Sequence, residues 1–175
     1  MPENISASEF DRTFLPHMDA AYNLARWLMR NDQDAQDVVQ EAFLRAFRFA
    51  GGFRGGDAKA WLLAIVRNAA FTWMKRNRGD NSPVEFDESF HVEEFTESGL
   101  EADAIKKVDR AMIQSALEDL AVEFREVLVM RDIEGLSYKE IAQVADLPIG
   151  TVMSRLARAR RRLARLIKKR IGKES

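Results

Sequence analysis

Apolar residues recur every three or four positions through most of the chain, the spacing that places them on one face of an α-helix. In the first 78 residues this pattern predicts four helices. The first begins at the capping-box pair Ser6 and Glu9 and ends before Pro16, which can stand in the first turn of a following helix but not inside one. That second helix reaches about Arg30.

The third and fourth predicted helices flank a glycine-rich loop. Asp32 or Asp34 is expected to cap the third helix, which ends at Gly51 and Gly52. The fourth runs from Asp57 to about Arg78. The apolar positions expected to face the core are Val39, Phe43, Ala46 and Ala50 in the third helix and Trp61, Leu62, Ile65, Ala69 and Thr72 in the fourth, with Trp73 also in the core.

The segment 79–105 has no helical period and opens on a Gly-Asp-Asn-Ser-Pro run that stops a helix. It carries nine acidic residues and no basic one. We predict a flexible acidic linker there. Two roles stay open: a solvated tether, or an acidic strip with interleaved phenylalanines that lies in a basic channel of a partner or folds back on the basic terminal helix.

Helical spacing returns at Val108 and continues to Gly135. Ser137 and Glu140 form a second capping box, which opens a helix ending at Ala145. A short turn through Pro148 then leads to a last helix, which Gly150 or Thr151 is expected to cap and which runs to about Ile171. Two helices joined by such a turn are typical of a helix-turn-helix. The sequence therefore predicts an all-α fold with two small helical domains, 1–78 and 106–175, joined by the linker 79–105.

Composition excludes several classes of protein. The chain has no cysteine, and its two histidines, His17 and His91, are far apart, so zinc-finger, iron–sulfur and thiol chemistry are not expected. No cluster suggests a catalytic pocket, and we expect neither enzymatic activity nor a cofactor. The first residues lack a secretory signal and no segment is long enough to span a membrane, so we expect a cytoplasmic protein that does not insert into membranes.

Acidic and basic residues are concentrated in different segments of the chain, although the formal net charge is only −1. Residues 150–173 carry ten basic residues and no acidic one, which indicates an anionic partner for the last helix. A buried stripe from Val152 to Leu163 leaves the opposite face outward. We expect Met153, Ser154, Ala157, Arg158 and Arg161 to present side chains to base edges, and Arg155, Arg160, Arg162, Arg165, Lys168, Lys169 and Arg170 to meet phosphates or solvent.

Two pairs of motifs carry a family resemblance. The segments 34–46 (DAQDVVQEAFLRA) and 60–68 (AWLLAIVRN) resemble region two of bacterial sigma factors of the extracytoplasmic-function group, group IV. The segments 134–142 (EGLSYKEIA) and 147–160 (LPIGTVMSRLARAR) resemble region four of the same family. The resemblance covers nearly everything except the linker, and the motifs occur in the expected order.

The resemblance implies an alternative sigma factor, which binds RNA polymerase core enzyme and directs it to promoters by recognising a −35 duplex and a melted −10 element. An anti-sigma factor is a further expected partner. The resemblance assigns docking on the polymerase clamp to Asp34, Asp37, Gln40, Glu41 and Leu44. An ordinary solvated helix would also favour acidic residues in its first turn.

Reading an opened strand requires planar side chains for unstacked bases and cations for the backbone. The candidates for −10 DNA are Phe53, Arg54, Arg67, Asn68, Phe71, Lys75 and Arg76, and Phe53 could instead plug the core. The candidates for −35 DNA are Tyr138, Lys139, Thr151, Met153, Ser154, Arg155, Ala157, Arg158, Arg161 and Arg162.

Two departures from the common family pattern affect which DNA sequence is preferred, and they do not affect the class of protein. Thr72 stands where many members have Asp, and Met153 where many have Lys or Arg. A methionine cannot make the bidentate guanine contact that an arginine makes. The rival interpretation is a helix-turn-helix repressor or activator that acts without entering the polymerase.

Overall fold

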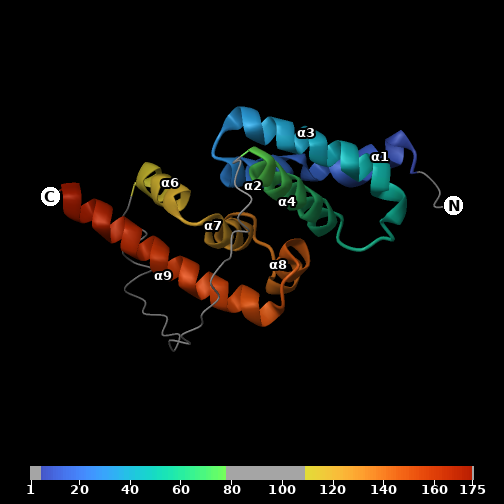
Figure 1. Cartoon of the computed structure of the whole chain (residues 1–175). Coiled ribbons are helices and arrows are strands. Elements are labelled where there is room, and N and C mark those ends of the chain that lie inside the picture. Colours follow the sequence, from blue (N-terminus) through green and yellow to red (C-terminus); the bar gives the residue numbers. More distant parts are fainter. Residues whose placement is uncertain (1–4, 78–108, 175) are drawn as a thin grey trace.

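The computed structural model describes residues 5–77 and 109–174, and every regular element in those ranges is a helix (Figure 1). The predicted linker 79–105 lies outside the described residues. The predicted all-α class is confirmed. The N-terminal half contributes α1 (Ala7–Phe14), η1 (Leu15–His17), α2 (Met18–Met29), α3 (Asp32–Phe49), η2 (Ala50–Gly52) and α4 (Ala58–Asn77). The C-terminal half contributes α6 (Arg110–Asp119), α7 (Val122–Leu128), η3 (Val129–Ile133), α8 (Tyr138–Ala145) and α9 (Ile149–Glu174).

Helix starts follow the capping residues closely. Both predicted capping boxes are present, with the hydroxyl of Ser6 accepting from the Glu9 backbone amide and that of Ser137 from the Glu140 amide. The predicted cap of α3 was wrong. Asn31 has an extended backbone and accepts from the Asp34 amide at 3.0 Å, because it stands immediately before the first helical residue.

The C-terminal helices differ from expectation in two details. A turn of π-helix, η3, continues α7 before Gly135, whose φ of +71° allows the chain to leave the helix. The turn of the helix-turn-helix is shorter than predicted, because α9 begins at Ile149, so Gly150 and Thr151 lie inside the helix and neither caps it. Asp146 makes this tight turn possible by ending α8 in the left-handed conformation.

Replacing Ser137 with alanine removes the side-chain acceptor at the start of α8. We expect the free energy of unfolding to fall by about 1 kcal/mol. Urea denaturation followed by circular dichroism measures this change. Gln143→Ala, on the exposed side of the same helix, serves as the matched control and is expected to have little effect. Equal stability of Ser137→Ala and the wild type would show that the cap contributes nothing.

Small side chains set the packing of α3, and here the predicted core face was partly wrong. The buried positions are Ala35, Val38, Ala42, Ala46 and Ala50, whereas Val39 and Phe43 are half-buried. Alanines allow α3 to approach α2 and α4 closely, and the larger residues then flank the contact. The expected tryptophans of α4, Trp61 and Trp73, are half-buried and pack against the core.

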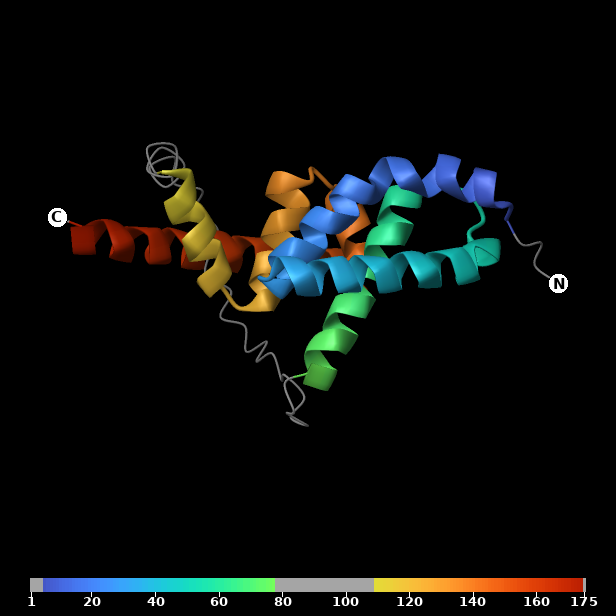
Figure 2. The same cartoon turned by 90° about the horizontal axis from the view of Figure 1, so that it is seen from above.

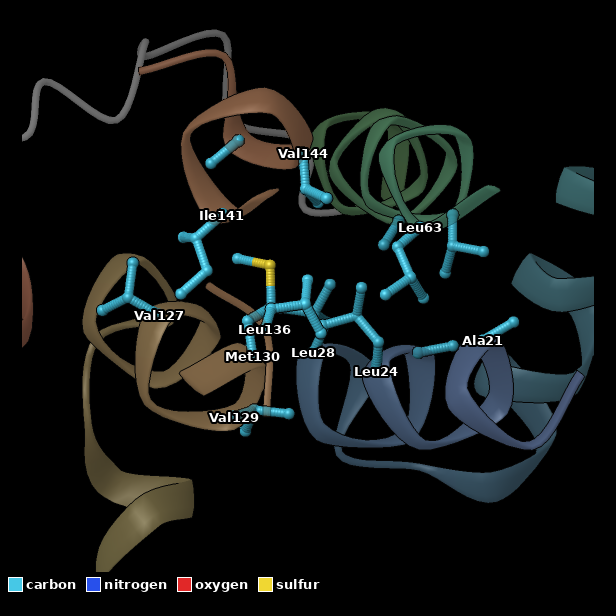
Figure 3. Packing of buried hydrophobic residues seen from close by; sticks show 14 of the residues in the cluster. Ala21, Leu24, Leu28, Leu63, Val127, Val129, Met130, Leu136, Ile141 and Val144 are labelled. Carbon is cyan, nitrogen blue, oxygen red and sulfur yellow. The ribbon is translucent and has the colours of Figure 1, made fainter. Parts of the chain in front are cut away.

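The two halves share one hydrophobic core. Helix α4 packs on α2 and α3 on one side and on α8 on another, and α2 also contacts α7 and η3 (Figure 2). Figure 3 shows side chains from both halves in one cluster: Leu24 and Leu28 of α2 and Leu63 of α4 lie on one side, Ile141 and Val144 of α8 on another, with Met130 and Leu136 between α2 and α8. The structure is therefore a closed arrangement, in which helices far apart in sequence bury apolar surface together.

Candidate nucleic-acid and polymerase interfaces

The candidate polymerase surface lies along the outer face of α3. Its five predicted residues fall within an arc of about 120° on the helix. Asp37, Gln40 and Glu41 are exposed, Asp34 is half-buried, and Leu44 is 60% exposed. The side chain of Glu41 accepts from Arg45 Nε at 3.0 Å, an i,i+4 pair that holds the carboxylate along the helix. The structure brings these residues together as one acidic surface with an apolar residue, Leu44, at its C-terminal end.

Sequence reasoning missed an apolar continuation of this surface. Phe47 is 51% exposed on α3, and it follows Leu44 and Gln40 on adjoining turns. The centroid of its ring lies 5.3 Å from the centroid of the Phe10 ring in α1. A large exposed aromatic residue beside a candidate docking site could have been found from the sequence, because it stands off the buried stripe of α3.

The candidate −10 residues divide between a loop and α4. Arg67, Asn68, Phe71 and Lys75 fall within an arc of about 100° on the helix, whereas Arg76 points elsewhere. Asn68, Lys75 and Arg76 are exposed, and the guanidinium of Arg67 lies 4.4 Å from the centroid of the half-buried Phe71 ring. The helix thus offers a cation stacked on an aromatic ring, a combination that suits an unstacked base and its backbone.

Phe53 packs in an aromatic cluster while Arg54 beside it is exposed. The Phe53 ring lies 5.5 Å from Phe14 and 5.4 Å from Trp61, between centroids, and it is half-buried. Two glycines with positive φ, Gly55 and Gly56, follow and let the loop turn into α4. Phe53 therefore packs against the core, as one of the two expectations had it. The exposed part of its ring stays accessible to a DNA base, so the other expectation is not tested.

Arg67 is engaged by the other half of the chain. Its Nε and Nη2 donate to the two carboxylate oxygens of Glu126 in α7 at 2.7 and 3.0 Å, a bidentate pair. The Arg67 side chain is 17% exposed and that of Glu126 is fully buried. Desolvation raises the pKa of the Glu126 carboxyl, and the hydrogen bonds from Arg67 oppose that rise.

This raised pKa gives a pH prediction with a definite sign. The folded protein binds the Glu126 proton more tightly than the unfolded chain, so stability is lost as pH rises from the ordinary glutamate range into the raised range. Arg67, Arg155 and Glu123 are the charged groups that act on this carboxyl. We expect the stability of the wild type relative to Glu126→Gln to decrease as the pH rises above the ordinary glutamate range, measured by urea denaturation. A pH-independent difference would contradict the burial effect.

The candidate −35 surface is built by α8 and the first turns of α9. Lys139, Met153 and Arg162 are exposed, with Met153 52% exposed, and Tyr138, Thr151, Ser154, Arg158 and Arg161 are half-buried. The guanidinium of Arg131 lies 4.8 Å from the centroid of the Tyr138 ring, and that of Arg162 lies 4.5 Å from the Phe124 centroid. These contacts orient part of the face that the sequence predicted to meet DNA.

Two predicted outward positions of α9 are buried in this arrangement. Arg155 is 8% exposed and Ala157 is 7% exposed. Arg155 lies one turn from both Val152 and Ala159, so helical geometry places it at the edge of the buried stripe. The methyl group of Ala157 lies between the much longer side chains of Met153 and Arg161, one turn away on either side.

Some cations of α9 have acidic partners within the C-terminal half. Arg160 donates to Asp132 at 3.0 Å, and Arg170 pairs with Asp119 and also bonds the Ser115 carbonyl. The sequence interpretation had expected Arg160 and Arg170 to meet phosphates or solvent. In this conformation they tie α9 to η3 and α6 instead.

A buried arginine that the sequence did not single out joins the halves. Arg125 of α7 donates from Nε to the Trp27 carbonyl at 2.7 Å and from Nη1 to the Leu120 carbonyl at 2.7 Å, with longer bonds to Leu28 and Glu118 at 3.3 Å. The Trp27 and Leu28 carbonyls belong to the last turn of α2, where the helix has no donors of its own. The guanidinium thus also complements the negative end of the α2 dipole.

Comparison with known families matches both halves of the chain. Residues 13–79 match the model for sigma-70 region 2, and residues 110–163 match the model for sigma-70 region 4. The RNA polymerase sigma-H factor of Pseudomonas aeruginosa is 36% identical over 160 residues, which are 86% of this chain and 82% of that protein. Relatives named ECF RNA polymerase sigma factors are 35% to 38% identical to this chain. The chain belongs to the extracytoplasmic-function sigma factors. The predicted family is thereby confirmed.

Other relatives agree on the family. The ECF RNA polymerase sigma factor SigM of Mycobacterium tuberculosis is 38% identical over 90% of this chain and 76% of that protein. The ECF RNA polymerase sigma factor SigE of Mycolicibacterium smegmatis is 37% identical over 88% of this chain, and this sigma factor spans 60% of the length of that relative.

Solved structures resemble this sigma factor over most of its length. The sigma factor RpoE of Bartonella quintana, in complex with the anti-sigma factor NepR, has a TM-score of 0.70 and 28% identity over 93% of this chain and 98% of that chain. CnrH in complex with the cytosolic domain of CnrY has a TM-score of 0.65 and 26% identity over 94% of this chain and 90% of that chain. Within 5–77 and 109–174, no helix of this sigma factor is long and apolar enough to cross a membrane.

Proposed function

We propose that this protein is an alternative sigma factor that binds RNA polymerase core enzyme and directs promoter-specific initiation. The observation that carries the proposal is the match to both sigma-70 regions, in order, on one chain. A repressor with a helix-turn-helix needs only the second of these regions. Relatives that match both regions together bear the name of RNA polymerase sigma factors.

The proposed division of labour follows the halves of the chain. Residues 1–78 bind the polymerase and the melted −10 strand, 79–105 connect, and 106–175 bind the −35 duplex. The exposed side of α3 docks on the polymerase clamp through an acidic surface that has Leu44 at its C-terminal end. Exposed apolar and charged residues in one patch support this role, because interfaces of this kind combine a buried anchor with a polar rim.

The two DNA surfaces are proposed to use different chemistry. On α4, Arg67 and Phe71 hold backbone and base of the opened strand, with Asn68 and Lys75 beside them and Arg54 in the loop. On α9, base edges in the major groove are contacted from the side that carries Met153, Ser154, Ala157, Arg158 and Arg161. The phosphates are bound by the exposed cations Arg162, Arg165, Lys168 and Lys169. Because Met153 cannot replace an arginine at a guanine, we expect a −35 preference that depends on apolar contact with a thymine methyl group at that position.

Partners and location follow from the same proposal. We infer that the polymerase supplies all the chemistry of transcription and that this chain contributes no catalytic residue or cofactor. We also infer that it acts in the cytoplasm, with the polymerase. Its similarity to RpoE and CnrH, whose structures contain NepR and CnrY, supports control by an anti-sigma factor.

A run-off transcription assay with purified core enzyme tests the proposal. A pool of genomic fragments serves as template, with core alone and this protein alone as controls. We expect discrete transcripts only when core and this protein are combined. Tight binding of the protein to duplex fragments with no core-dependent transcript would instead identify a repressor or activator.

A further inference from the structure

Two neighbouring residues of η3 contact the two helices of the helix-turn-helix. Asp132 accepts from Arg160 Nη2 of α9 at 3.0 Å, and the guanidinium of Arg131 lies over the ring of Tyr138, the first residue of α8. We propose that Asp132 is a positioning residue for −35 recognition, which withholds Arg160 from the DNA backbone and, through Arg160, fixes Tyr138. The inference rests on the proposed function, because it assumes that α8 and α9 bind the −35 duplex.

Arg160 lies on the side of α9 that is proposed to read base edges. It follows Met153 by seven positions, so the two side chains project within about 20° of each other around the helix. An arginine at this place is long enough to reach a backbone phosphate beside the groove. The hydrogen bond to Asp132 occupies its guanidinium instead, and the same hydrogen bond is the main cause that raises the pKa of Arg160.

Withholding this cation favours sequence discrimination over general affinity. A phosphate contact strengthens binding to every DNA sequence alike, because the backbone carries no sequence information. A released arginine on the reading side of α9 would bind the nearest phosphate and draw the helix away from the position in which its other side chains meet base edges. The pair between Asp132 and Arg160 prevents that competition.

Tyr138 is held by two arginines at the start of α8. The Arg131 guanidinium lies 4.8 Å from the centroid of the Tyr138 ring, and its Nη1 donates to the Leu136 carbonyl at 2.8 Å. Arg160 is hydrogen-bonded to the Tyr138 side chain as well as to Asp132. The first helix of a helix-turn-helix crosses the DNA backbone, and such contacts set the register of the second helix on the bases. Fixing Tyr138 therefore fixes where α9 reads.

The pair can be removed without unfolding the protein. The Asp132 side chain is 48% exposed and that of Arg160 is 34% exposed. Ion pairs that are open to solvent contribute little to stability, because water screens their attraction. Substitution of Asp132 therefore changes DNA reading and leaves the fold intact, and circular dichroism checks the fold of each variant.

Asp132→Ala tests the inference in holoenzyme assembled from core polymerase. Fluorescence anisotropy measures binding to two duplexes, one that carries the −35 element of a promoter found by run-off transcription and one in which those bases are shuffled. We expect binding about threefold tighter to the shuffled duplex, because the released Arg160 reaches a phosphate, and about threefold weaker to the promoter duplex. Discrimination falls by about tenfold. The slope of log affinity against log salt on the shuffled duplex becomes steeper by about 0.9.

Three further variants separate positioning from charge. Asp132→Glu keeps the carboxylate and is expected to regain most of the discrimination. Asp132→Ala/Arg160→Met lacks the released cation, so the gain on the shuffled duplex should disappear. Asp119→Ala is the matched control, because it breaks a surface pair with Arg170 about 15 Å further along α9 and should leave discrimination unchanged.

The outcomes distinguish this inference from the proposed function. If the wild type prefers the promoter duplex and Asp132→Ala keeps the same preference, the inference alone is overturned. Equal losses of Asp132→Ala on both duplexes would assign Asp132 to stability, and equal gains would assign it to charge alone, and either result overturns the inference. A wild type that does not distinguish the two duplexes overturns the proposed −35 function, and the inference with it.

Discussion

Arg125→Met is expected to lower the free energy of unfolding by about 3 kcal/mol, the largest stability effect of any single substitution considered for this protein. Methionine has a similar length but no donor. The carbonyls of Trp27 and Leu120 would each lose a bond of 2.7 Å and that of Leu28 a longer one, whereas the Glu118 carbonyl would keep its bond from Arg30. Unpaired buried carbonyls carry a desolvation cost that an apolar side chain cannot offset.

Urea denaturation measures the effect, and Arg48→Met provides the matched control on the exposed side of α3. The control removes an arginine that is open to solvent and is expected to change stability by less than about 0.5 kcal/mol. Wild-type stability of Arg125→Met would contradict this account of the junction.

Asp37→Ala/Leu44→Ala is expected to weaken binding to core polymerase by about a hundredfold, the largest functional effect that we predict. Both residues are exposed on one face of α3, seven positions apart, and neither takes part in the core. The loss should therefore appear in affinity without a loss of folding. In the proposed interface, Leu44 supplies the apolar anchor and Asp37 supplies the charge that selects a basic partner.

A matched pair of substitutions separates this surface from a general effect of charge and apolar area. Asp11→Ala/Leu15→Ala removes the same residue types from α1 and η1, where Asp11 is exposed and Leu15 is 44% exposed. Fluorescence anisotropy with labelled protein and unlabelled core measures both affinities. Similar losses in the two double variants, or no loss in either, would contradict the assignment of the docking surface to α3.

Most of the helices could be predicted from the sequence because the residues that begin and end them lie within one turn of each helix end. The boxes at Ser6 and Ser137, the proline at 16 and the glycine at 135 each act within one turn, so the sequence alone places those helix ends. The cap of α3 was assigned wrongly because Asn31, Asp32 and Asp34 are all good caps, and only backbone conformation chooses among them.

Contacts between the halves could not be predicted in the same way. Periodicity shows that α4 is apolar on more than one side but does not show which helix covers the second side. Arg125 and Glu126 look like ordinary charged residues of an amphipathic helix, and their burial depends on carbonyls and a guanidinium about 100 and 60 residues away along the chain. The candidate site residues were found from motif spacing, whereas the pairing of Arg67 required the fold.

The central claim is that one half reads duplex DNA while the other holds an opened strand, and that both act only with the polymerase. Footprinting a promoter found by run-off transcription, combined with permanganate detection of unpaired thymines, tests it most directly. We predict protection near −35 together with reactive thymines near −10 when core and this protein are both present, and neither reactive thymines nor extended protection with the protein alone. Full protection by the protein alone, with no opened bases on adding core, would contradict the claim.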